Sequence, residues 1–161
     1  FNLSVVRDVD RVVVSSKQYY HFMRARAESE TAKYVAAMYD KREEEHGWMQ
    51  ELYQHWGIDD KASKEFLARR YIERLVGCVE NVTNKNCKMT RHEKKQEISR
   101  MLSNPNVSES LALAKPRSAM MRMILVPIRW KNTGLTYLES RLITRVKAGN
   151  ARLFARLKAK R

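Results

Sequence analysis

The clearest indication of the fold comes from AKYVAAMYDKREEEHGWMQELYQHWGIDDKASKEFLARRYIERLVGCV, residues 32–79. Apolar side chains recur at helical spacings through its first half and predict a helix over residues 32–56. Gly57 suits the residue just after a helix, and Asp59 or Asp60 suits the N-cap of the next one. The second helix is expected to bury one apolar stripe: Phe66, Leu67, Tyr71, Leu75 and Val79. Two long helices joined by a short turn predict an antiparallel helical hairpin.

The composition agrees with a mainly α-helical fold. The chain has 161 residues, enough for a modest core, and 43% of them are hydrophobic while 31% are charged. Five glycines and three prolines are few for the many turns of a many-stranded sandwich or barrel. Trp48 and Trp56, eight residues apart within the first expected helix, are interpreted as core residues.

Shorter helices are predicted after the hairpin. Residues 81–89 read as a polar loop, and Thr90 with Glu93 has the spacing of a capping box that opens a helix. Pro105 lies in an Asn-Pro-Asn sequence that breaks this helix, and a short helix is expected over residues 107–114.

The last third of the chain, residues 115–161, carries most of the net charge. It contains thirteen basic residues and one acid, Glu139, so its net charge is +12, whereas the rest of the chain has a net charge of +2. The apolar run at residues 118–130 contains two arginines and falls short of the roughly 20 residues that a spanning helix needs.

Cationic amphipathic helices are predicted in this last third. Four aliphatic residues fall on one helical face, with basic residues around the other side: Leu135, Leu138, Leu142 and Val146. Such helices are typical of segments that lie in a membrane interface. The candidate membrane-binding residues are Arg122, Arg129, Trp130, Lys131, Arg141, Arg145, Lys147, Arg152, Arg156 and Lys158.

The N-terminal region holds the one good β signal. Residues 11–24, RVVVSSKQYYHFMR, place a polar turn between a valine run and an aromatic run, which predicts a short β-hairpin or two short strands. The phrase that follows contains Arg24, Arg26, Ser29 and Thr31. Two guanidinium groups and two hydroxyl groups after a strand are suited to binding phosphate oxygens, although a polar linker has the same composition.

No complete active site is visible from the residues alone. Asp8 and Asp10 form a D-x-D, the spelling of a metal-binding motif in many glycosyltransferases, but no nucleotide-binding pattern precedes them and a solvated turn is the preferred interpretation. Cys78 and Cys87 have no zinc-site spacing and are interpreted as reduced thiols. The sequence contains no glycine-rich phosphate loop and no nucleophile elbow.

Two phrases resemble a known family. YYHFMRARAESET, residues 19–31, resembles the end of the catalytic domain in bacterial family 2 glycosyltransferases of capsule and exopolysaccharide synthesis, where a tyrosine-rich strand runs into an R-x-R-x-x-S-x-T phrase. AKPRSAMMRMILVPIRWKNTGLTYLE, residues 114–139, with the basic segment that follows, resembles the C-terminal extension of Gram-positive members. The likeness covers essentially the whole chain but includes no invariant catalytic motif.

The resemblance implies a division into three parts. Residues 1–31 would be the end of a catalytic α/β domain, residues 32–114 a helical accessory region, and residues 115–161 a basic membrane-docking region. The donor site, with its D-x-D and Glu-Asp base, would lie upstream of Phe1. The chain, which opens inside an apolar phrase, is therefore expected to be a piece of a longer polypeptide and to be inactive alone.

The resemblance also implies ligands and a location. Arg24, Arg26 and Ser29, with His21 nearby, would close over the diphosphate of the donor or acceptor. This chain would hold no cofactor of its own, whereas the parent enzyme would use a nucleotide sugar and a divalent metal. Its partners would be the upstream catalytic domain, a lipid-linked or polysaccharide acceptor, and the anionic inner face of the cell membrane, to which a cytoplasmic enzyme would bind peripherally.

Two other functions fit the charge. A basic helical domain could bind nucleic acid, but phosphate contacts do not require the long aliphatic faces of the last third, and no helix-turn-helix or stacking platform is recognisable. The same apolar faces could instead bury against a protein partner or a second subunit.

Overall fold

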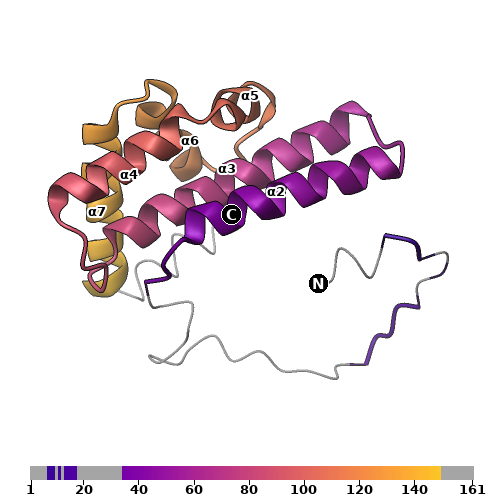
Figure 1. The fold of residues 1–161 in the computed structure, drawn as a ribbon, viewed down its shortest axis with the longest axis horizontal. Coiled ribbons are helices and arrows are strands. Elements are labelled where there is room, and N and C mark those ends of the chain that lie inside the picture. Colours follow the sequence, from indigo (N-terminus) through magenta and orange to yellow (C-terminus); the bar gives the residue numbers. More distant parts are fainter. Residues whose placement is uncertain (1–6, 10, 12, 18–33, 150–161) are drawn as a thin grey trace.

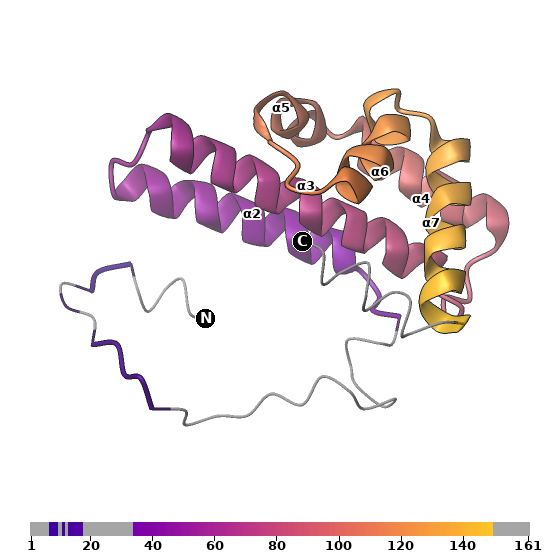
Figure 2. The same ribbon diagram turned by 180° about the vertical axis from the view of Figure 1, so that it is seen from behind.

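The computed structural model describes residues 7–9, 11, 13–17 and 34–149, and within them the chain is mainly α-helical, as predicted. The helices are α2 (Met38–His55), α3 (Lys61–Thr83), α4 (Arg91–Ser103), α5 (Pro105–Leu113), α6 (Ala119–Arg129) and α7 (Thr133–Gly149). The long helices α2 and α3 lie side by side and run in opposite directions (Figures 1 and 2). α4, α5 and α6 gather on the side of α3 away from α2, and α7 stands across one end of the molecule.

The turn between α2 and α3 forms as its sequence predicts. Gly57 has a φ of 64° and follows Trp56, the C-cap of α2. Its N–H donates to the Gln54 carbonyl oxygen and that of Ile58 donates to the Tyr53 carbonyl oxygen, a Schellman arrangement. Asp60 is the N-cap of α3 and accepts hydrogen bonds from two backbone N–H groups of its first turn.

The start of α2 differs from the prediction. The helix begins at Met38, whereas residues 34–37 are not helical and residues 32 and 33 lie outside the described part. The Asn81 side chain of α3 accepts a hydrogen bond from the Val35 N–H at 2.9 Å and donates one to the Val35 carbonyl oxygen at 2.8 Å. Because both backbone groups of Val35 are bound by this distant amide, this segment is held outside the helix.

Local capping signals define the next two helices. The Thr90 N–H donates to the Glu93 carboxylate at 2.6 Å, and the Glu93 N–H donates to the Thr90 hydroxyl, so the predicted capping box is confirmed. α5 begins at Pro105, two residues earlier than predicted, because proline suits the first turn of a helix and Asn104 serves as its N-cap.

The core surrounds the C-terminal two thirds of α3. Each of the six described helices contributes buried side chains to it. They include Tyr71, Ile72, Leu75, Val79, Ile98, Met101, Leu102, Val107, Leu125, Ile128 and Tyr137. Phe66 is exposed, so the expected stripe of α3 is buried only from Tyr71 onward. Trp48 and Trp56 are 45% and 41% exposed, and their assignment to the core was wrong. α2 instead packs through Tyr39, His46, Met49 and Leu52.

A polar cluster joins α2 to α3 and to the α4–α5 junction. Glu43 accepts hydrogen bonds from the Tyr71 hydroxyl at 2.6 Å, from the Asn104 amide at 2.9 Å and from the Asn106 amide at 3.0 Å. The Asn104 amide also donates to the Tyr39 hydroxyl at 2.8 Å. Burial raises the pKa of Tyr39 to about 12 and also raises the pKa of Tyr71, so both phenols stay neutral near physiological pH.

The predicted N-terminal β-hairpin is not confirmed. Residues 11 and 13–17 are not in a strand, and Val13 and Val14 are exposed. The aromatic half of the segment, with His21, lies outside the described residues.

Candidate functional site

The candidate residues divide into a described and an undescribed group. Arg24, Arg26, Ser29 and His21 lie outside the described residues, as do Arg152, Arg156 and Lys158. Lys147 belongs to α7, but the structure does not describe its side chain. The remaining candidates surround α6, α7 and the corner between them: Arg122, Arg129, Trp130, Lys131, Arg141 and Arg145.

α7 presents its aliphatic stripe to solvent. Leu135, Leu138, Leu142 and Val146 are between 36% and 64% exposed. The face that packs inward is formed mainly by Thr136, Tyr137 and Ser140. The Ser140 hydroxyl lies 2.6 Å from the Thr83 hydroxyl of α3, a buried hydrogen bond. Hydroxyl groups with satisfied hydrogen bonds can be buried, which leaves the stripe of leucines on the outside.

α6 is apolar on both of its faces. Met121, Ile124, Leu125 and Ile128 are buried against the core. The opposite face exposes apolar side chains beside two arginines: Met123, Val126, Trp130, Arg122 and Arg129. An exposed tryptophan among arginines is suited to the boundary between water and lipid.

The cations of this region differ in their partners from four arginines of α2, α3 and α4. Arg42, Arg69, Arg74 and Arg100 each form an ion pair with a carboxylate. Among the described residues, none of Arg122, Arg129, Lys131 and Arg145 forms one. Arg141 lies over the Tyr137 ring, with its guanidinium carbon 5.6 Å from the ring centroid. These charges are therefore available to an external anion.

For the surface of α6 and α7 we use the name docking face. It consists of the partly buried Arg141 and of the exposed apolar and cationic side chains Arg122, Met123, Val126, Arg129, Trp130, Lys131, Leu135, Leu138, Leu142, Arg145 and Val146. α6 and α7 are joined by a short corner and pack against one another. α4 crosses α7 on one side, and in Figure 2, where α7 lies in front of α4, no described helix covers the side of α7 turned toward the viewer.

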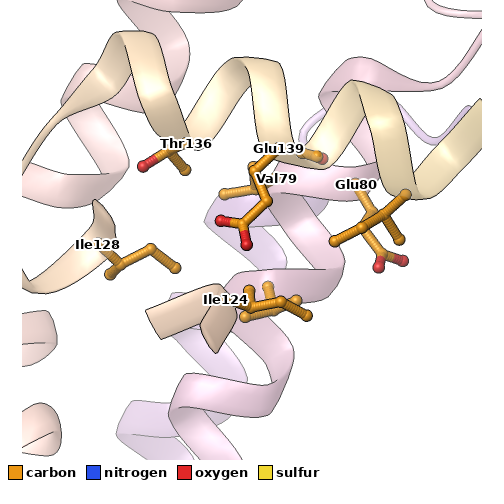
Figure 3. Close-up of a pocket in the computed structure, with 9 residues that line it drawn as sticks. Val79, Glu80, Ile124, Ile128, Thr136 and Glu139 are labelled. Atoms are coloured by element: carbon orange, nitrogen blue, oxygen red, sulfur yellow. The ribbon is translucent and has the colours of Figure 1, made fainter. Parts of the chain in front are cut away.

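A small hollow lies behind the docking face, between α3, α6 and α7 (Figure 3). It is lined by Val76, Val79, Glu80, Ile124, Ile128, Thr136, Glu139, Ser140 and Ile143. The Glu139 carboxylate is directed into this apolar space, near Val79 and Ile124. Burial raises the pKa of Glu139, since an ionised carboxylate is poorly solvated there. Glu139 could have been singled out from the sequence because it is the single acid in residues 115–161.

Replacing Glu139 with glutamine should stabilise the protein near neutral pH. The folded protein binds the Glu139 proton more tightly than the unfolded chain does, so this contribution to stability is full below the ordinary pKa of 4.5 and is lost as pH rises through the folded value. Glutamine cannot ionise. Thermal unfolding should therefore give a higher midpoint for the variant than for the unmodified chain near neutral pH, and equal midpoints at about pH 4. A difference between the midpoints that is the same at both pH values would show that ionisation of Glu139 is not its cause.

The described residues provide no catalytic constellation. No group of three or more histidine, cysteine, aspartate or glutamate side chains is placed to hold a metal ion among them. Cys78 and Cys87 are buried and form no disulfide, and burial raises the pKa of Cys78 to about 11, which suppresses its thiolate. Asp8 lies 3.3 Å from the His55 imidazole, while Asp10 lies outside the described residues. His46 is buried, and its ring packs on that of Tyr71.

The fold and the docking face define a helical protein with an exposed, cationic and amphipathic surface. Comparison with protein-family models, with curated proteins and with solved structures finds no match to this chain. Among the described helices, none has the length and apolarity required to traverse a lipid bilayer.

Proposed function

We propose that the docking face binds the anionic inner surface of the cell membrane and that the chain is the C-terminal part of a glycosyltransferase that uses a nucleotide sugar. The observation that carries the membrane half is the combination of unpaired cations and exposed aliphatic side chains on α6 and α7. A basic residue near an anionic bilayer contributes roughly 1 kcal/mol. The exposed leucines add the burial of apolar surface, which a purely electrostatic partner does not provide.

The transferase half rests on the resemblance of residues 19–31 and 114–139 to bacterial family 2 enzymes. In this proposal the nucleotide sugar and the divalent metal bind an upstream catalytic domain, of which residues 1–31 are the last part. Arg24, Arg26, Ser29 and His21 contact a diphosphate. The acceptor is a lipid-linked or polysaccharide glycan, and docking at the membrane brings the cytoplasmic enzyme to it. The isolated chain transfers no sugar.

Vesicle co-sedimentation tests the membrane half. The whole chain should bind vesicles that contain phosphatidylglycerol, bind pure phosphatidylcholine much more weakly, and lose affinity at high salt, since exposed charges are screened. The double variant Arg122→Gln/Arg129→Gln should bind about 10- to 30-fold more weakly, from roughly 1 kcal/mol per charge.

The matched control is Lys41→Gln/Lys61→Gln, which removes two exposed positive charges from α2 and α3. It should bind vesicles almost as the unmodified chain does. An equal loss in both double variants would mean that net charge, and not the docking face, drives binding. Binding to duplex DNA without binding to vesicles would assign the cations to nucleic acid.

The transferase half has its own test in the coding sequence upstream of Phe1. An alternating β-α pattern that contains a D-x-D and ends in Glu-Asp would support it, and any other pattern there would oppose it. Incubating the purified chain with nucleotide sugars, a lipid-linked acceptor and Mn²⁺ tests the expected inactivity, because any product formed would contradict it.

A further inference from the structure

The corner between α6 and α7 has an unusual residue at its tightest point. Lys131 has a φ of 50°, in the left-handed region that side chains with a Cβ avoid. Its N–H donates to the Ile128 carbonyl oxygen at 3.0 Å, and the Asn132 N–H donates to the Pro127 carbonyl oxygen at 2.9 Å. This is the Schellman arrangement, in which the left-handed position usually belongs to glycine.

The same chain contains a second corner of this kind for comparison. The C-cap of α2 is Trp56, followed by Gly57 with a φ of 64°, and the C-cap of α6 is Trp130, followed by Lys131. The backbone geometry is the same, but only the second corner places a lysine where a glycine would be unstrained. The hydrogen bonds of the Lys131 corner are the backbone ones common to both corners, so they give no reason for a lysine.

The two tryptophans also differ in their surroundings. The Trp56 indole N–H donates to the Arg7 carbonyl oxygen at 2.8 Å. Trp130 is 70% exposed, and neither its indole N–H nor the Lys131 ammonium has a hydrogen-bond or ion-pair partner among the described residues. Arg129, immediately before them, is exposed as well. Three consecutive side chains thus present an indole and two cations to solvent.

This set of groups matches one chemical environment. An indole with an apolar body and one N–H donor is favoured at the level of lipid headgroups, where the ring meets acyl chains and the N–H meets water or phosphate. A lysine or arginine beside it reaches the phosphate oxygens, while its aliphatic stem covers apolar surface. Residues held in sparsely populated backbone regions cluster at binding and active sites.

We propose that the corner formed by Arg129, Trp130 and Lys131 is the anchor of the docking face, with the Trp130 indole at headgroup depth and the Lys131 ammonium on lipid phosphate. The inference rests on the proposed membrane binding and names the residues that make the deepest contact. It also assigns the positive φ of Lys131 to a binding role.

The variant Lys131→Gly tests the anchor, because it relieves the backbone while removing the cation. It should raise the midpoint of thermal unfolding and yet weaken binding to phosphatidylglycerol vesicles about fivefold, as expected from the loss of roughly 1 kcal/mol. Lys131→Arg keeps the charge and should bind as the unmodified chain does. The control Lys61→Gly makes the same lysine-to-glycine change at an exposed site on α3 and keeps Lys131. It should leave vesicle affinity unchanged.

Tryptophan fluorescence tests the depth of the contact. In the variant Trp48→Phe/Trp56→Phe, Trp130 is the single remaining tryptophan of the chain. Its emission should shift to shorter wavelength on addition of phosphatidylglycerol vesicles and should be quenched by lipids brominated near the headgroup. Inorganic phosphate alone should cause no shift. A shift with inorganic phosphate equal to that with vesicles would replace lipid by a free phosphate ligand.

The outcomes separate this inference from the proposed function. If the unmodified chain fails to bind vesicles at low salt, the proposed membrane binding itself fails. If the chain binds vesicles but Lys131→Gly binds equally well and Trp130 emission stays constant, the docking face stands and the anchor lies elsewhere on it. Weaker binding together with a higher unfolding midpoint in Lys131→Gly would support the anchor.

Discussion

Replacing Glu43 with alanine should lower the free energy of unfolding by about 2–4 kcal/mol. The substitution removes the acceptor of hydrogen bonds from the Tyr71 hydroxyl and from the Asn104 and Asn106 amides. A buried donor left without its partner costs roughly 1–3 kcal/mol, and relaxation or water entry would recover part of the sum over three donors. Urea unfolding followed by circular dichroism measures the change.

The neighbouring residue supplies the control. Glu44 is exposed on the same helix, so Glu44→Ala removes the same side chain without breaking this cluster, and its effect should be within about 0.5 kcal/mol. Glu43→Gln, which keeps one acceptor oxygen, should fall between the two. Equal stability of Glu43→Ala and Glu44→Ala would show that the cluster does not fasten α2 to the α4–α5 junction.

Placing aspartate at Leu138 and Leu142 should reduce binding to phosphatidylglycerol vesicles on the order of 100-fold. Both leucines are more than half exposed, so the substitutions should leave the fold intact. Each change forfeits about 1–2 kcal/mol of apolar burial in the bilayer interface and adds a charge that the anionic lipid repels. Co-sedimentation at fixed salt measures the loss, and circular dichroism verifies the helical content.

Leu113→Asp is the matched control for this prediction. Leu113 is 50% exposed at the end of α5 and is not one of the docking-face residues. Its substitution should leave vesicle binding nearly unchanged apart from the small effect of one added negative charge. If Leu138→Asp/Leu142→Asp bound vesicles normally but converted an oligomer to a monomer in light scattering, the leucine stripe would be a protein interface.

The helix boundaries show which features of the fold can be predicted from the local sequence. The caps at Asp60 and Thr90 and the turn at Gly57 were predictable because every group in them lies within a few residues of its partner. The start of α2 could not be predicted in this way. It depends on hydrogen bonds between Val35 and Asn81, which lie 46 residues apart, so no local pattern contains that information.

The buried faces show the same limit. The periodicity of α7 identifies a leucine face and a face of Thr136, Tyr137 and Ser140, and hydrophobicity alone would favour burying the leucines. The structure buries the other face, where Ser140 meets Thr83 from α3. Trp48 and Trp56 were misplaced for a related reason, since α2 has several apolar residues and its neighbours decide which of them face inward.

Composition and local pattern predict the mainly helical fold, the caps that bound its helices, and the concentration of positive charge in residues 115–161. These are properties of composition and of short-range order, which adjacent residues specify. Tertiary packing instead sets the outward direction of the α7 leucines and the entry of the Glu139 side chain into an apolar hollow. Each of these depends on which helices pack against one another, because packing determines which face of a helix loses contact with water.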